Sequence, residues 1–596
     1  MKKILIMALV AASIGSLSSC ADFLDREPMT KPEAGTFLTG QIQVENYING
    51  LYITLPSFSK FGMGVRSEEK NSDNIIAEKY DPRLHGQNNQ FSGASDWQTG
   101  FQNLRKVNYF FYYYKVPEEL ETQDVLSLKG EAYFFRAYWH FYLLKKFGPI
   151  PVMDSFWDEN ATVGGLQIPA KSRNEVAKFI LSDLEQAKGM LNSRSKYSGI
   201  RVNKEAAMVL AMNVALYEGT WEKYHEGSDF ASPANESAYF LGEVLKWGDE
   251  LFKCGIDLYK TGVNPGDAYA VLFNSTDLSG IDEVLLWRKY SNEEGVFHSV
   301  NANLKAGVVD TEGAAGITQS LVDNYLNEDG TFINPKDEKF KDFIKTFEGR
   351  DPRLIQTVMN EGAKFASATT ARPMHLEAYT ETAKDKISAP KLAGDGNSRS
   401  LTGYHTRLGI DTTFVNGNGE TALPVIRYAE ALLAYAEAAA ELGQCTEDVL
   451  TKTLKALRER AGVTYVKPAS RDANFSSFGY ELTPVLQEIR RERRSELALQ
   501  GFRLDDLMRW KADKLIVGQR GRGAYVGDES LLFGAFSPEN QKTIRERLTV
   551  DEQGWADPMA GTLTNGYQFH ADRDYLLPIP PSELELNKTL HQNPKW

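Results

Sequence analysis

Residues 490–510 read RRERRSELALQGFRLDDLMRW and lie in the most densely charged part of the chain. From Glu488 to Glu496, four Arg and three Glu give a net charge of only +1. A surface that binds nucleic acid would not interleave so many carboxylates with its arginines. On a helix, Glu488 with Arg491 and Arg493 with Glu496 stand three residues apart and can form ion pairs. We therefore predict a structural role for this run, in which planar guanidinium groups hold carboxylates and carbonyl oxygens.

The segments around this run predict more helices. We expect the run to belong to a helix from Leu486 to Gln500 that Gly501 stops, because glycine commonly ends helices. Further helices are expected at Leu504–Ala512, at Val449–Arg460 closed by Gly462, and at Arg427–Ala439 ending near Gly443.

The N-terminal half shows helical periodicity of the same kind. Apolar side chains recur at steps of three and four residues in the stretches 101–111, 132–143 and 176–191. Asn203 is a suitable N-cap for the next helix, whose small residues from Ala206 onward let neighbouring helices approach closely. Paired antiparallel helices of this sort form tetratricopeptide-like arrays, although the strict repeat consensus is absent. We expect a mainly α fold, with tetratricopeptide-like helix pairs in an α-α superhelix and a loop-rich, partly irregular region.

The middle of the chain, residues 255–425, is different. It is rich in Gly, Asn, Thr and Asp and has few helical stripes. Residues 283–287, EVLLW, predict a short strand, so we assign Trp287 to the core. Residues 394–400 and 416–419 are clusters of turn-forming residues. We expect this region to lie over the helices as loops that carry function.

Composition is that of a globular protein and restricts its partners. The 596 residues are 42% hydrophobic and 25% charged, and the formal net charge is −13. An acidic chain repels phosphate backbones, so nucleic acid is disfavoured as a partner. With only three cysteines, Cys20, Cys254 and Cys445, a disulfide-built scaffold is excluded. A single bridge between Cys254 and Cys445 stays open.

The first nineteen residues have the layout of a secretory signal. Lys2 and Lys3 precede an apolar run over residues 4–12, which is too short to span a bilayer. No later stretch of the sequence offers the 18 or more apolar residues of a membrane helix. We therefore expect residues 1–19 to be a signal peptide.

The end of this signal is more specific. Leu-Ser-Ser-Cys at 17–20 resembles the lipobox of bacterial lipoproteins, in which the chain is cut before a cysteine that then carries acyl chains. The alternative is an ordinary signal cut near Ser19. We expect lipidation of Cys20, which anchors the chain to a membrane, followed by a tether over residues 20–40. The acidic residues after the cysteine resemble the surface-export signal of Bacteroidetes lipoproteins: Asp22, Asp25 and Glu27.

A search for chemistry-bearing motifs finds none. The sequence has no His-Glu-x-x-His, Cys-x-x-Cys, Walker loop, Gly-x-Gly-x-x-Gly or Gly-x-Ser-x-Gly. Gly521-Arg522-Gly523 is a short fragment that we interpret as a turn. We expect no catalytic residue, no metal site and no cofactor. The paired carboxylates of a glycosidase leave no local signature, so a hydrolase stays open.

Several segments resemble the SusD/RagB family. Residues 490–510 match its signature, and the ending agrees, with YLLPIP at 575–580 and QNPKW at 592–596. Other segments match in the same order: Trp97–Asn108, GEAYFFRAYWHFYLLKKFGPIPV at 130–152, RYAE at 427–430 and LRERAG at 457–462. The resemblance implies an N-terminal SusD-like helical part over 41–254, the ligand-face loops over 255–425, and a C-terminal part over 426–596 that completes the scaffold.

The resemblance also implies a function. SusD-like proteins are outer-membrane lipoproteins that face the cell exterior and bind nutrients without cleaving them. They sit as lids over a SusC-like TonB-dependent transporter. Most serve glycan uptake, so we expect an oligosaccharide ligand. A peptide- or protein-capturing lid is the alternative, and a glycoside hydrolase is a third reading.

Ligand candidates follow from the chemistry of sugars. Pyranose faces lie well on exposed aromatic rings, and hydroxyl groups need fixed polar partners. In the family, the loop before the Trp97 helix builds part of the ligand face, and here that loop is 66–96. We expect ligand contacts from loop residues, from Trp97 and from aromatics after the Trp287 strand, with Trp157, Trp221 and Trp555 ranked below these. The candidates are Asp73, Asn74, Tyr80, Arg83, Asn88, Trp97, Tyr290 and Phe297.

Overall fold

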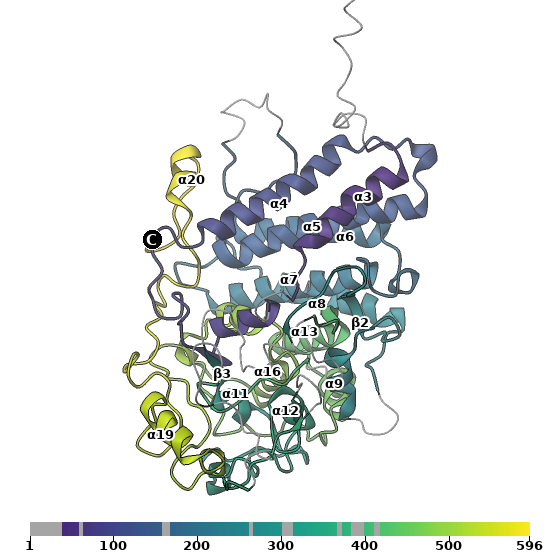
Figure 1. Ribbon diagram of the computed structural model, residues 1–596. Helices are drawn as coiled ribbons and strands as arrows, with labels where there is room; N and C mark the ends of the chain where they lie inside the picture. Colours follow the sequence, from purple (N-terminus) through teal and green to yellow (C-terminus); the bar gives the residue numbers. More distant parts are fainter. Residues whose placement is uncertain are drawn as a thin grey trace, which may run out of the picture.

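The computed structural model describes residues 38–58, 64–157, 167–260, 266–300, 314–365, 372–382, 392, 399–409 and 418–596. Long helices form its N-terminal part, at the top of Figure 1. Consecutive helices from α4 to α8 pack against one another, as the sequence predicts. The helices are α3 (Gln41–Leu51), α4 (Ala94–Tyr113), α5 (Gln123–Phe147), α6 (Arg173–Met190), α7 (Lys204–Tyr224) and α8 (Ser237–Leu251).

Helix α7 lies at the centre of this part because its residues are small where its neighbours pass. The side-chain oxygen of Asn203 accepts from the backbone N–H of Ala206 at 2.9 Å, which confirms the predicted N-cap. A Cβ on Gly219 would stand 2.9 Å from Cγ of Leu241 on α8. This close packing brings α13 (Tyr428–Glu441) against both α7 and α8, so the C-terminal half closes on the N-terminal helices.

The remaining helices are short. The C-terminal half holds α14 (Glu447–Leu450), the π-type turn η8 (Thr451–Lys455), α15 (Ala456–Arg460), α16 (Pro484–Glu496), α17 (Arg503–Arg509), α18 (Leu531–Gly534), α19 (Pro538–Arg547) and α20 (Pro581–Leu586). The central region holds α9 (Asp267–Asn274), α11 (Gln319–Asn324) and α12 (Pro352–Thr357). The 3₁₀ turns are η1 (Tyr52–Thr54), η2 (Gly64–Asn71), η3 (Glu118–Leu120), η5 (Arg194–Lys196), η6 (Phe252–Cys254), η7 (Glu338–Lys341) and η9 (Asp513–Leu515).

Strands in the described residues form only two-stranded antiparallel pairs. They are β1 (Ile75–Ala77) with β3 (Ala315–Ile317), β2 (Val284–Arg288) with β6 (Leu423–Arg427), and β4 (Lys364–Phe365) with β5 (Arg372–Pro373). Strand β2 confirms the predicted strand, and Trp287 on it is buried, as expected. The fold is therefore mainly α, with loops and small strand pairs in the lower half of Figure 1.

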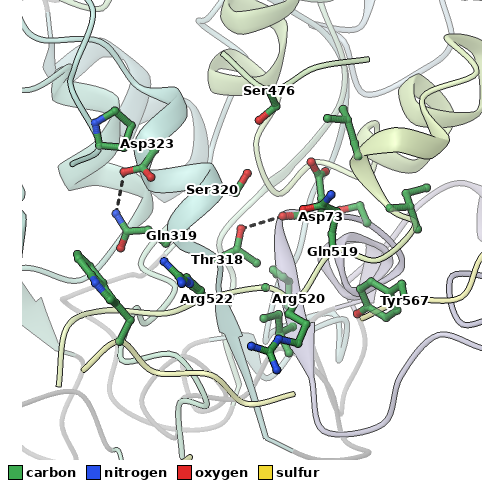
Figure 2. A pocket seen from close by; sticks show the side chains of 18 of the residues that line it. Asp73, Thr318, Gln319, Ser320, Asp323, Ser476, Gln519, Arg520, Arg522 and Tyr567 are labelled. Atoms are coloured by element: carbon green, nitrogen blue, oxygen red, sulfur yellow. Dashed lines mark hydrogen bonds between the residues drawn. The ribbon is translucent and has the colours of Figure 1, made fainter. Parts of the chain in front are cut away.

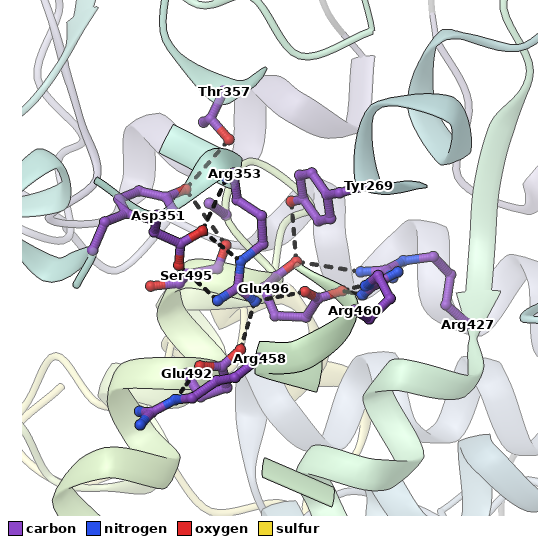
Figure 3. A network of polar contacts seen from close by, with 12 residues as sticks. Tyr269, Asp351, Arg353, Thr357, Arg427, Arg458, Arg460, Glu492, Ser495 and Glu496 are labelled. Atoms are coloured by element: carbon purple, nitrogen blue, oxygen red, sulfur yellow. Dashed lines mark hydrogen bonds and ion pairs between the residues drawn. The ribbon is translucent and has the colours of Figure 1, made fainter. Parts of the chain in front are cut away.

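The arginine-rich helix α16 runs through the interior. Glu496 is fully buried and receives three guanidinium groups: Arg460 Nη2 at 2.5 Å, Arg353 Nη1 at 2.8 Å and Arg427 Nη1 at 3.0 Å. Figure 3 shows these residues converging from separate elements. Burial alone would raise the pKa of Glu496, but the three arginines outweigh burial and lower the pKa to about 2. These buried ion pairs confirm the predicted structural role of the arginine-rich run.

One predicted pair on this helix is wrong. Glu488 and Arg491 do pair, at 2.9 Å. Arg493, however, binds Asp506 of α17 at 2.8 Å instead of Glu496. Spacing along a helix sets only which partners are within local reach, and here a carboxylate from the next helix lies closer.

Helix α16 also ends earlier than predicted, at Glu496 and not at Gln500. Leu499 adopts a φ of 62° and Gly501 one of 86°, so the left-handed turn that ends the helix begins before the glycine.

Cys254 and Cys445 are both free thiols in this structure. No helix in the described part of the chain combines the length and the apolar character that a membrane span requires.

Candidate functional site

A cavity of about 1120 Å³ opens where the N-terminal, central and C-terminal segments meet. We call it the polar cleft, and Figure 2 shows it from close by. Its floor comes from β1 and the start of α11, and its walls come from loops far apart in the sequence. The lining residues are Leu84 and members of the segments 72–76, 318–323, 335–341, 476–479, 514–522 and 553–567.

Asp73 sits at the floor and is held by two arginines of α16 and α17. Arg503 Nε lies 2.7 Å from its carboxylate, and Arg494 Nη2 lies 3.2 Å from it. Burial would raise the pKa of Asp73, but Arg494 and Arg503 outweigh it and lower the pKa to about 2. Thr318 donates its hydroxyl to the Asp73 carbonyl oxygen at 2.8 Å. The floor is therefore rigid and ionised.

A second carboxylate, Asp323, lies farther along the same wall. Gln319 Nε2 donates to it at 2.7 Å, as Figure 2 shows. Burial raises the pKa of Asp323 to about 6. The hydrogen bond and the nearby cations Arg350 and Arg494 oppose that rise. Asp323 can thus accept a hydrogen bond from a ligand hydroxyl near neutral pH.

The wall formed by residues 519–523 presses against the floor because it contains glycine. A Cβ on Gly521 would stand 2.1 Å from Cδ1 of Ile76, so a side chain is excluded there. The backbone N–H of Gln319 donates to the carbonyl oxygen of Arg522 at 2.7 Å and ties the wall to α11. The sequence suggests a turn for Gly521-Arg522-Gly523. In the structure this segment forms part of the cavity wall.

Cationic side chains from two segments, 335–341 and 514–522, line the cleft. Arg520 pairs with Asp557 at 3.0 Å, and Arg522 pairs with Asp551 at 3.0 Å. The other lining cations come from the segments 335–341 and 514–522: Lys336, Lys341 and Lys514. Each of these groups can donate hydrogen bonds to sugar oxygens.

Two aromatic side chains also line the cleft. Trp555 is half-buried, and its ring meets that of Tyr525 edge to face at 5.7 Å. An isolated bridge between the backbones of Tyr525 and Trp555 fixes this position. Tyr567 is 6% exposed, and burial raises its pKa well above the usual value. Trp555 is therefore the lining ring with the more accessible surface.

The loop candidates from the sequence have mixed placements. Asp73 lines the cleft, whereas Asn74 is buried and donates to Glu69 at 2.7 Å. Tyr80 lies beside the cleft, with its ring 6.4 Å from that of Tyr567. Arg83 is 8% exposed and donates to backbone carbonyl oxygens of residues 574 and 575. Asn88 is half-buried in its loop.

The aromatic candidates do not gather at the cleft. Tyr290 is 4% exposed and packs on Phe58 and His298. In this structure its ring has no open face for a sugar. Phe297 is half-buried near it. Trp97 is 5% exposed and lines a different, apolar groove. The structure therefore does not bring Tyr290, Phe297 or Trp97 to the polar cleft.

The apolar groove has a volume of about 810 Å³ and runs between α4, the loop 151–157 and α20. Its walls include Trp97, Phe101, Phe156 and Trp157. Its lining offers fewer hydrogen-bonding groups than the polar cleft. In the described part of the chain, no cluster of three or more His, Cys, Asp or Glu side chains is arranged to hold a metal ion.

Sequence reasoning missed most of the polar cleft. Gln519, Arg520 and Lys514 were not among the candidates, and Trp555 was ranked low. The Gly-Arg-Gly fragment at 521–523 was the available signal, because glycines flanking a cation mark a backbone that approaches another segment closely. That signal does not say which segment is approached.

The chain is similar to known proteins along most of its length. Residues 283–596 match the model described as the SusD family, and residues 22–216 match the model described as "Starch-binding associating with outer membrane". A SusD-like protein P2 from Formosa agariphila is 23% identical over 479 residues, which cover 79% of this chain and 74% of the relative.

Solved structures share the fold. A SusD-like carbohydrate binding protein from Bacteroides fragilis superposes with a TM-score of 0.69 and 21% identity, covering 93% of this chain and all of that one. A crystal structure with xylogluco-oligosaccharide gives a TM-score of 0.54 and 16% identity, with coverage of 92% and 98%. Because the first family model matches more than half of the residues of this chain, the chain belongs to the SusD family.

Proposed function

We propose that the protein captures an oligosaccharide in the polar cleft and does not cleave it. The observation that carries the proposal is one large cavity in which hydrogen-bonding side chains and an accessible tryptophan converge. Cavities for drug-sized ligands are about 300–1,000 Å³, so 1120 Å³ leaves room for several sugar rings. The names of the relatives support the ligand class, since one is a carbohydrate binding protein and another holds a xylogluco-oligosaccharide.

The side chains of the cleft suit this ligand. Trp555 provides an apolar face on which the C–H surface of a pyranose can lie. Asp323 and Gln519 can exchange hydrogen bonds with hydroxyl groups on either side. Asp73 is already held by two arginines, so the floor needs no rearrangement to receive a ligand. Such preorganisation raises affinity because few side chains lose freedom on binding.

We further propose that the protein works at the outer face of the outer membrane, anchored by acyl chains on Cys20. The lipobox and the acidic residues after it support this placement, and they lie outside the described residues. A SusC-like TonB-dependent transporter is the proposed partner that receives the ligand. The description of the N-terminal family model, which mentions association with the outer membrane, supports the same location.

Replacing Trp555 by Ala tests the ligand site. A glycan array first identifies a bound oligosaccharide, and calorimetry then measures its affinity. We expect Trp555→Ala to weaken binding about 5-fold, since an aromatic contact contributes about 1 kcal/mol. Trp555→Phe should retain most of the affinity. Trp157→Ala is the matched control, because that tryptophan lines the apolar groove instead.

Other results would redirect the proposal. A loss of affinity in Trp157→Ala with full affinity in Trp555→Ala would place the ligand in the apolar groove. Binding of peptide pools without binding of any glycan would favour the peptide-capturing alternative. Release of new reducing ends by the purified protein would identify a glycosidase.

A further inference from the structure

The polar cleft differs in charge from the rest of the molecule. The chain as a whole carries 80 acidic and 67 basic residues, so an average surface is negative. The accessible charges in the cleft are instead mainly cationic. From their arrangement we infer that the cleft selects an acidic oligosaccharide, one whose rings carry carboxylate or sulfate groups. This inference rests on the proposed function and adds the class of ligand to it.

The first support is the orientation of two ion pairs at the wall. The guanidinium side chains of Arg520 and Arg522 are 37% and 48% exposed and line the cleft. Their partners, Asp557 and Asp551, are 2% and 8% exposed and do not line it. Each pair therefore presents its cation to the cavity and keeps its carboxylate behind the wall. A planar guanidinium group can still bind a carboxylate or sulfate through its remaining donors.

The second support is a pair of lysines with no carboxylate of their own. Lys336 and Lys514 line the cleft from different loops, and both are exposed. Within the ranges that the structure describes, no carboxylate lies within ion-pair distance of either ammonium group. Lys341 on the same loop as Lys336 is paired with Glu338 at 2.6 Å, so it adds little net charge.

The third support is the floor. Arg494 and Arg503 share the carboxylate of Asp73 at 3.2 and 2.7 Å, so Asp73 adds no unpaired negative charge to the cleft. The lining carboxylates are Asp73, Asp323, Asp337 and Glu338, against five lining cations: Lys336, Lys341, Lys514, Arg520 and Arg522. Asp337 already accepts from the backbone N–H of Lys339 at 3.0 Å. Because Asp73 is paired with its arginines and Glu338 with Lys341, the two lysines and the exposed guanidinium groups of Arg520 and Arg522 outnumber Asp323 and Asp337.

An acidic sugar is favoured over a neutral one by this geometry for a general reason. Cations drawn from separate loops around one cavity raise the local concentration of an anion and orient it. The attraction is screened by salt, because the Debye length falls from about 10 Å at 0.1 M to about 3 Å at 1 M. A neutral glycan would show no comparable salt dependence.

The test compares three probes of equal length: an oligouronate, the same oligosaccharide with its carboxyl groups reduced to alcohols, and a sulfated neutral oligosaccharide. Affinity is measured at 50 and 500 mM NaCl with the wild type and with Lys336→Gln/Lys514→Gln. These lysines are exposed and leave no buried carboxylate behind when they are replaced. Arg545→Gln is the matched control, since Arg545 is an exposed cation away from the cleft and is paired with Asp528 at 2.5 Å.

We expect at least one acidic probe to bind about 10-fold or more tightly than the reduced probe at 50 mM salt. The double lysine variant should lose about 5- to 10-fold for the acidic probe and almost nothing for the reduced one. The acid group is identified by which acidic probe binds. Equal or tighter binding of the reduced probe would overturn the inference and leave the proposed function intact. If no glycan binds, the proposed function itself fails.

Discussion

The buried carboxylate of Glu496 should be one of the strongest single supports of the fold. Glu496→Gln removes the negative charge that three guanidinium groups share, at 2.5, 2.8 and 3.0 Å. The amide group also adds a donor where the pocket already holds only donors. Because Glu496 is fully buried, water cannot replace the lost charge.

Two independent estimates of the cost agree. The pKa of Glu496 falls from an ordinary value of 4.5 to about 2, and one pKa unit corresponds to about 1.4 kcal/mol, which gives about 3 kcal/mol. Removal of one partner from a buried ion pair costs about 3–5 kcal/mol. We therefore expect the free energy of unfolding to fall by about 3–4 kcal/mol at pH 7.

The pH dependence gives a second readout. A carboxylate with a depressed pKa in the folded state stabilises the protein above its unfolded pKa, and this contribution is lost as the pH falls from 4.5 toward 2. The difference in the free energy of unfolding between wild type and Glu496→Gln should therefore become about 1 kcal/mol smaller when the pH is lowered from 7 to 4.

Urea denaturation followed by circular dichroism at the two pH values measures the gap. Glu481→Gln is the control, since Glu481 forms an exposed pair with Arg471 and should change stability by less than about 0.5 kcal/mol. A loss below about 1 kcal/mol in Glu496→Gln, or a gap that does not change with pH, would refute the reasoning.

Two further predictions concern the anchor and a buried acid. Cys20→Ala should leave the protein in the soluble periplasmic fraction, because no acyl chain then holds it; recovery in the membrane fraction would contradict lipid anchoring. Burial and the neighbouring charge of Glu218 raise the pKa of Glu222 on α7 to about 7, so the folded state is progressively destabilised as the pH rises from 4.5 through 7. Glu222→Gln should therefore melt at a higher temperature than wild type at pH 8 and at nearly the same temperature as wild type at pH 5. An equal difference in melting temperature at the two pH values would contradict a raised pKa of Glu222.

Local patterns were enough to predict the scaffold. The N-cap at Asn203, the strand with Trp287 and the Glu488–Arg491 pair of the arginine-rich run all depend on neighbours within a few residues. The pairing of Arg493 with Asp506 was not predictable in this way. It depends on how α17 folds back on α16, which spacing within one helix does not encode.

The polar cleft could not be predicted for a related reason. Its lining comes from segments more than 200 residues apart, and only the fold brings them together. Aromatic residues illustrate the difficulty, because sequence alone does not tell a buried ring from an accessible one. Tyr290 follows a strand as an exposed residue would, yet it is buried, whereas Trp555 in a glycine-containing loop stays accessible.

The difference between the buried floor of the polar cleft and its more exposed lining side chains has an evolutionary consequence. Asp73 is fixed by arginines that also belong to the interior, so substitutions there would compromise folding. Lys336 and Lys514 are exposed and Trp555 is half-buried, and most changes at exposed positions alter stability by less than about 0.5 kcal/mol. Proteins descended from one ancestor can therefore acquire new ligands through substitutions at the exposed lining positions, and the stability of the scaffold is not affected.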